Sequence, residues 1–111
     1  MSKAQFWQKG EALDYRNSTT ALIEADTILV VGDRIGVAGG DIPPGELGSI
    51  IVGGAVFEMP KAGDAAIGAG KEVFWDGTGI TAESGTGTVK AGYAAQDAAA
   101  DADRILVCIN A

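Results

Sequence analysis

The chain has 111 residues, of which 47% are hydrophobic, and its net charge is −7 at pH 7. This length fits one domain, and the hydrophobic share excludes an intrinsically disordered chain. The acidic surface repels phosphate groups, so we expect neither nucleic acid nor a membrane surface as the partner.

Short strand-like runs separated by turn residues fill the first half of the chain. The predicted strands cover residues 11–16, 27–31, 34–38 and 49–59. Gly32-Asp33 predicts a tight turn, and residues 39–46, which include Pro43-Pro44-Gly45, predict a loop. Gly53-Gly54 inside the longest run predicts a bulge or bend, and Pro60 ends that run.

The second half continues the same pattern, with predicted strands at residues 72–75, 78–82, 86–93 and 104–109. Asp76-Gly77 predicts a hairpin turn. Residues 94–102 are rich in Ala but have no apolar stripe, so they predict a loop or a single turn. The whole pattern predicts an all-β fold, a small barrel or sandwich with Gly-rich turns. We expect an extended N-terminal arm over residues 1–10 and a single β domain over residues 11–111.

Two pairs of segments indicate faint internal repetition. Residues 25–30 match residues 102–107 at five of six positions, and residues 65–70 resemble residues 21–26. Two interpretations remain open. Similar turn–strand units recur by chance, or the chain contains a pseudo-repeat.

No catalytic arrangement is visible in the sequence. The chain has no His, which excludes Ser-His-Asp and Cys-His sites. Residues 68–72 resemble a phosphate-binding loop, but Ala65 replaces its first Gly and Glu72 replaces its Ser or Thr. We therefore expect a β-turn there, no catalytic or cofactor-binding residue, and no enzyme activity. The acidic residues Asp97, Asp101 and Asp103 lack the spacing of a calcium loop, so no metal site is predicted.

The aromatic residues fall into two groups. Phe57, Phe74, Trp75 and Tyr93 lie in predicted strands and are expected in the core, and Cys108 is expected to be a buried, inert thiol. Phe6 and Trp7 lie in the arm, where they either dock back on the domain or anchor a partner. The candidate partner-binding residues are Phe6, Trp7, Lys9, Pro43 and Pro44.

The N-terminal residues 1–7 lack the apolar region of a signal peptide. The longest apolar stretch, residues 50–57, is far shorter than the roughly 20 residues of a membrane-spanning helix. We expect the protein to be made and kept soluble in a cytoplasm.

Several motifs together resemble one family of small tailed-phage and prophage proteins. They are Phe6-Trp7-Gln8-Lys9-Gly10-Glu11-Ala12-Leu13-Asp14-Tyr15, Ile35-Gly36-Val37-Ala38, Gly45-Glu46-Leu47-Gly48, Gly54-Ala55-Val56-Phe57-Glu58-Met59-Pro60-Lys61-Ala62 and Ala69-Gly70-Lys71-Glu72-Val73-Phe74-Trp75-Asp76. Members of that family were long labelled as predicted RecA/RadA-type recombinases, and they are now read as capsid cement, or decoration, proteins.

The resemblance thus implies two conflicting functions, and the residues favour the second. A recombinase of that class needs a phosphate loop and an α/β core, and neither pattern is present. We expect a decoration protein that binds the major capsid protein on the outer surface of the virion, as a homotrimer. The alternatives are a nucleotide- or DNA-handling protein of phage recombination, and another virion component such as a head-fibre base or a tail protein.

Overall fold

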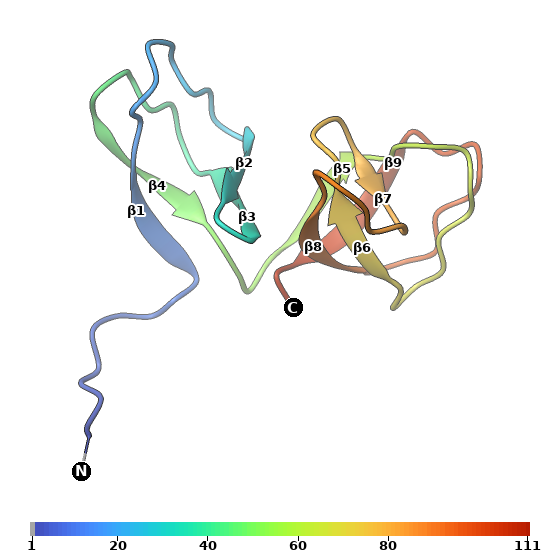
Figure 1. Cartoon of the computed structure of the whole chain (residues 1–111), viewed down its shortest axis with the longest axis horizontal. Helices are drawn as coiled ribbons and strands as arrows, with labels where there is room; N and C mark the ends of the chain where they lie inside the picture. The colour runs from blue at the N-terminus through green and yellow to red at the C-terminus, as the bar shows by residue number, and fades with distance from the viewer. Residues whose placement is uncertain (1) are drawn as a thin grey trace.

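The computed structural model describes residues 2–111, which form nine strands in two antiparallel sheets (Figure 1). The first sheet has the order β1 (Ala12–Arg16), β4 (Leu47–Ile51), β3 (Arg34–Ala38), β2 (Ile28–Val31). The second has the order β5 (Val56–Pro60), β9 (Arg104–Ile109), β8 (Val89–Ala94), β6 (Glu72–Trp75), β7 (Ile80–Thr81). The all-β prediction is confirmed, and of its two forms the sandwich-like arrangement is the one observed, since neither sheet formed by residues 2–111 closes into a barrel.

The predicted long strand over residues 49–59 is wrong. It is two strands, β4 and β5, that belong to different sheets. Between them the chain turns at Gly53-Gly54, where Gly54 has a φ of 67°, a backbone conformation that other residues rarely adopt. The apolar run continues across this turn because both flanking strands are partly buried, each in its own sheet.

The two sheets are built by the same sequence of strands and turns. Strands β1 to β4 pair in the order 1-4-3-2, and the strands β5, β6, β8 and β9 repeat this order as 5-9-8-6. The hydrogen bonds repeat as well. Ala38 N donates to Thr27 O at 2.9 Å, and Ala94 N donates to Lys71 O at the same distance. Each unit thus contains one copy of a four-stranded motif.

The loops that cover each sheet also correspond. An isolated bridge joins Ile23 to Ile42 in the first unit and Ile67 to Ala98 in the second. In each unit an Asp precedes the later residue of this bridge, Ile42 or Ala98, and its side chain accepts a backbone hydrogen bond at 2.8 Å. Asp41 Oδ1 accepts from Ala25 N, and Asp97 Oδ1 accepts from Ala69 N.

This correspondence separates the two sequence similarities. Residues 21–26 and 65–70 occupy equivalent positions, since each precedes the second strand of its unit. Residues 25–30 and 102–107 do not occupy equivalent positions. The first segment leads into β2 and the second into β9, whereas the equivalent of β2 is β6. The units differ mainly in one connection. The tight turn at Gly32-Asp33 joins β2 to β3, whereas residues 76–88, which include the short strand β7, join β6 to β8.

The main core lies between the sheets. Ile35 and Val37 of β3 pack there with residues of the second sheet such as Met59, Val73 and Val107. A smaller core lies on the other face of the first sheet, around Ile23, Ala38, Ile42 and Ile50. The first sheet therefore contributes to a core on each of its faces, whereas the second has its core on one face only.

The predicted core aromatics divide according to which face they lie on. Phe57 and Trp75 pack against the main core as expected, and Phe74 is partly buried. The prediction that Tyr93 lies in the core is wrong, since Tyr93 lies on the outer face of the second sheet and is 39% exposed. Cys108, which pairs with Tyr93 across β8 and β9, is half-buried rather than fully buried. A hydrogen bond with the Cys108 side chain raises the pKa of Tyr93.

Candidate functional site

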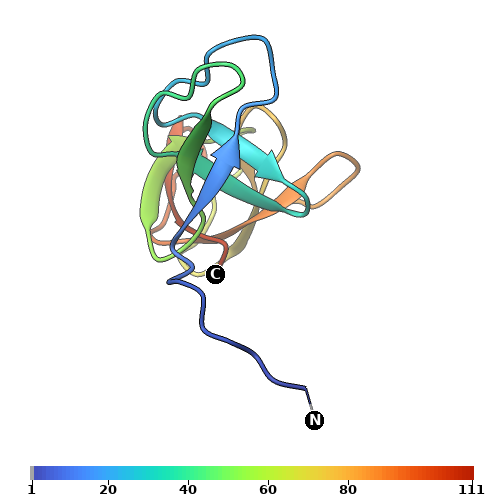
Figure 2. The ribbon, with the colours of Figure 1, turned by 90° about the vertical axis from the view of Figure 1, so that its left-hand side faces the viewer.

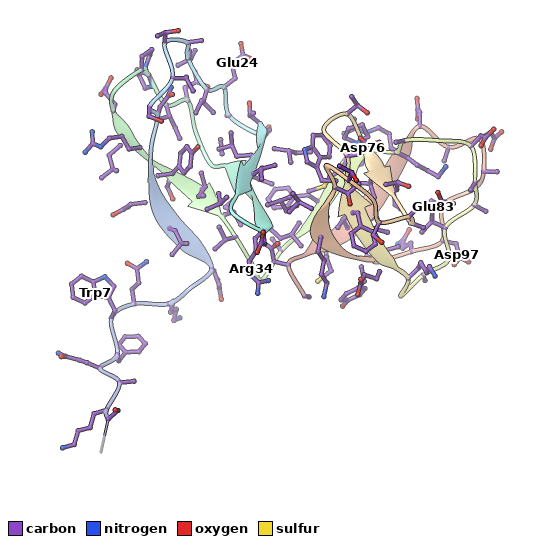
Figure 3. All side chains as sticks on the ribbon, viewed as in Figure 1. Trp7, Glu24, Arg34, Asp76, Glu83 and Asp97 are labelled. Carbon is purple, nitrogen blue, oxygen red and sulfur yellow. The ribbon has the colours of Figure 1, made fainter. Side chains whose placement is uncertain are left out.

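The N-terminal arm, residues 2–10, extends away from both sheets (Figures 1 and 2). Phe6 is 81% exposed and Trp7 is 88% exposed, and Figure 3 shows the Trp7 side chain projecting from the arm into open space. The arm is fixed near its base, where Gln8 Nε2 donates to Ala12 O at 3.3 Å. Large aromatic side chains on a projecting segment form an apolar surface without a partner in the monomer.

The arm also differs from the rest of the chain in charge. It contains Lys3 and Lys9 and none of the 15 acidic residues. It is therefore a cationic, aromatic segment on an acidic protein, a composition that suits an acidic protein surface as a partner.

The second predicted site, Pro43-Pro44, lies in an exposed loop that the buried side chain of Asn17 holds in place. Asn17 Nδ2 donates to Ile42 O at 2.7 Å and to Ala21 O at 2.8 Å. The backbone adds two bonds, from Gly45 N to Asn17 O at 2.7 Å and from Asn17 N to Glu46 O at 2.9 Å. The two prolines are thus presented on a firmly bonded loop.

The structure does not bring the two predicted sites together. The arm leads through Glu11 to the start of β1, whereas the proline loop lies at the other end of that strand, where Arg16 Nη1 donates to Gly45 O at 2.8 Å. The length of β1 separates them. Phe6, Trp7 and Lys9 form one candidate surface, and Pro43 and Pro44 form another.

The other motifs of the sequence have structural roles. Residues 68–71 form a β-turn in which Lys71 N donates to Gly68 O at 3.1 Å, and the chain continues into a strand, not the helix of a phosphate loop. Asp97 accepts the bond from Ala69 described above. Among residues 2–111, His, Cys, Asp and Glu side chains form no group that could hold a metal ion.

Sequence reasoning missed two apolar surfaces. One is a groove of about 390 Å³ on the first sheet, the Leu13 groove, lined by Gly10, Leu13, Val31, Arg34, Ile35, Val52 and Asn110. The other, the outer patch, lies on the outer face of the second sheet and consists of Val56, Tyr93, Leu106 and Cys108. A signal for the outer patch was available, because residues 105–109 are apolar on both faces of the strand.

A comparison with known protein families identifies the chain. The family model described as phage cement protein matches residues 7–109. The chain belongs to the phage cement protein family. No curated protein and no solved structure matched it.

Membership in the phage cement protein family identifies the type of protein. The family is a structural one, and its name implies association with the phage capsid. The match includes Trp7 and Lys9 of the arm as well as the proline loop. No helix within residues 2–111 is long and apolar enough to cross a membrane.

Proposed function

We propose that this cement protein binds the outer surface of the assembled phage head and stabilises it, with the N-terminal arm as its principal anchor. The exposure of Phe6 and Trp7 carries the proposal. A free aromatic pair is costly in water, and burial in a pocket between shell subunits would remove both side chains from solvent.

The partner is the major capsid protein, since it forms the continuous surface of a head. Lys3 and Lys9 favour an acidic region of that surface. The proline loop is a second contact, at the far end of β1 from the arm. Two separated contacts allow one copy to bridge neighbouring capsid subunits, and the second contact then forms at high effective concentration.

The protein binds as a homotrimer at local three-fold positions of the shell, because a cyclic assembly matches the symmetry of its site. We expect synthesis in the host cytoplasm and no cofactor or catalytic activity. An electron cryo-microscopy map of the decorated particle tests this part. Isolated single copies away from any three-fold position would contradict it.

The arm is tested by co-sedimentation with undecorated capsids. We expect Phe6→Ala with Trp7→Ala to weaken binding at least 10-fold, because a buried aromatic anchor contributes about 2 kcal/mol or more. Gln5→Ala, in the same arm, is the matched control and should bind like wild type. Circular dichroism should show an unchanged fold for both variants, since the altered side chains are exposed. Wild-type binding by the double variant, or equal loss in the control, contradicts the proposed anchor.

A further inference from the structure

The packing between the two units of the chain provides a template for a contact between two copies. The first unit places Ile28, Ile35, Val37 and Ile51 against the inner face of the second sheet, where they join the main core. This contact is directional, since the back of one unit packs into the front of the next. Here the front of a unit is the face that its own loops cover, and the back is the opposite face.

The first unit has the same kind of front, and no segment within residues 2–111 covers it fully. The strand register pairs four front residues of the first unit with four of the second. Leu13 is equivalent to Phe57, Tyr15 to Met59, Leu29 to Val73 and Val31 to Trp75. All eight side chains are apolar or aromatic. Met59 and Val73 are fully buried in the main core, to which the first unit contributes, whereas their equivalents Tyr15 and Leu29 are only partly buried against the smaller core. Leu13 is 41% exposed and lines the Leu13 groove.

The second unit has the same kind of back, and it is free. Residues of the outer patch have equivalents on the back of the first unit. Val56 is equivalent to Ala12, Tyr93 to Val37 and Cys108 to Ile51. Val56 is 54% exposed. The surface that packs internally in the first unit therefore recurs, unpaired, in the second.

The charges around the outer patch are compensated within the chain. Lys90 Nζ lies 3.6 Å from Glu72 Oε2, and Arg104 Nε lies 3.3 Å from Glu58 Oε1. This face is thus locally neutral on a protein of net charge −7. Because both copies are acidic, most of their surfaces repel each other electrostatically. The electrostatic repulsion is smallest where one copy approaches the neutral face of another.

We propose that copies of this protein associate head to tail, with the outer patch of one copy packed into the Leu13 groove of the next. The contact repeats between copies the packing that already joins the two units. An interface of this kind is heterologous, and it closes into a ring when the rotation between copies permits. Because Glu72 and Lys90 replace the apolar Ile28 and Ile35 of the template, the contact is weaker than the internal one.

The internal contact also predicts which residues meet. Ile28 and Val37 of the first unit line one cavity together with Phe57 and Met59 of the second. The equivalent contact between copies places Tyr93 of one copy beside Leu13 and Tyr15 of the next. This inference names the interface of the proposed trimer, and its test uses free protein, so that it can fail independently of capsid binding.

Directional cross-linking tests the interface. In a Cys108→Ser background, Leu13→Cys and Tyr93→Cys are made singly and together. The purified proteins are oxidised at about 1 mM, a protein concentration that is high enough to populate a weak contact. We expect the two single variants to cross-link when mixed but not alone. The double variant should form a disulfide-linked trimer or a ladder beyond the dimer on a non-reducing gel.

A matched control pairs Leu13→Cys with Ser84→Cys, an exposed position in the segment between β7 and β8, and should cross-link at background level. Efficient cross-linking of either single variant with itself would indicate an isologous dimer and overturn the proposal. The proposal would also be overturned if the mixture of Leu13→Cys and Tyr93→Cys cross-linked no more than the control mixture. Sedimentation velocity provides a second measurement. We expect the average mass of wild type to increase with concentration and Val56→Lys to abolish that increase. An undiminished increase in Val56→Lys would contradict the interface.

Discussion

The side chain of Asn110 donates from Nδ2 to the main-chain oxygen of Ile35 at 2.7 Å, across 75 residues of sequence. The same Nδ2 donates to Val52 O at 2.7 Å, and Ile35 N donates to Asn110 Oδ1 at 3.4 Å. Asn110 follows β9 of the second sheet, while Ile35 lies in β3 and Val52 follows β4 of the first. One amide therefore joins the end of the chain to the first unit.

Replacement of Asn110 should loosen this connection. Its φ of 53° adds backbone strain for Ala but not for Gly. We expect Asn110→Ala to lower the free energy of unfolding by about 2–4 kcal/mol, from lost hydrogen bonds and strain together. Asn110→Gly should cost about 1–3 kcal/mol, from the lost bonds alone. Urea denaturation measures both variants, and wild-type stability of both would show that the amide contributes little.

The buried Asn17 should matter for the proline loop as well as for stability. Asn17→Ala removes two donated bonds and the acceptor for Thr19, so we expect a loss of about 2–3 kcal/mol in unfolding free energy. Limited proteolysis should then cleave the segment 39–46 faster than in wild type. Ser18→Ala, at an exposed neighbouring position, is the control. Unchanged cleavage in Asn17→Ala would mean that the loop holds its shape without the amide.

The duplicated fold provides a matched pair of glycines. Gly36 of β3 and Gly92 of β8 occupy equivalent register positions, opposite Leu29 and Val73. A Cβ at Gly92 would run into the main-chain oxygen of Cys108, and its φ of 139° is unfavourable for other residues. At Gly36 a Cβ would come closest to the end of the Ile50 side chain, at 3.0 Å, and its nearest neighbours are all side-chain atoms.

Gly92→Ala should therefore destabilise the protein far more than Gly36→Ala. We expect about 3 kcal/mol or more for the first, from the steric conflict with main chain, and about 1 kcal/mol for the second. Thermal unfolding followed by circular dichroism compares the two. Equal melting temperatures for the two variants would contradict the predicted difference between the strands.

Asp76 should make a small, pH-dependent contribution to the turn between β6 and β7. Its carboxylate accepts hydrogen bonds from Thr78 N at 2.8 Å and Gly79 N at 2.9 Å, which lower the pKa of Asp76 below 3.8. The stabilisation is complete above pH 3.8 and is lost as the pH falls through the lowered pKa in the folded state.

Asp76→Ala should accordingly lower stability at pH 7 by less than about 1 kcal/mol, since the carboxylate is exposed and screened by water. The difference between variant and wild type should shrink as the pH falls below 3.8. Paired urea titrations at neutral and acidic pH measure it. A difference that grows on acidification would contradict the assigned hydrogen bonds.

Several elements of this fold could be read directly from local patterns. The predicted strands 34–38, 72–75 and 104–109 coincide with β3, β6 and β9, and the turn at Asp76-Gly77 lies between β6 and β7 as predicted. Alternation of side chains and turn chemistry are local properties, so they survive in the sequence. The family resemblance likewise rested on short motifs, and the family match confirms it.

Only the tertiary structure decided which strands share a sheet and which faces are covered. Residues 49–59 read as one strand, because a run of apolar residues does not reveal that Gly53-Gly54 carries the chain from one sheet to the other. Tyr93 alternates like a core residue, yet it is 39% exposed because no layer formed by the described residues covers its face. Local periodicity shows which side chains lie together, but burial depends on segments distant in sequence, and those are placed only by the packing of one unit against the other.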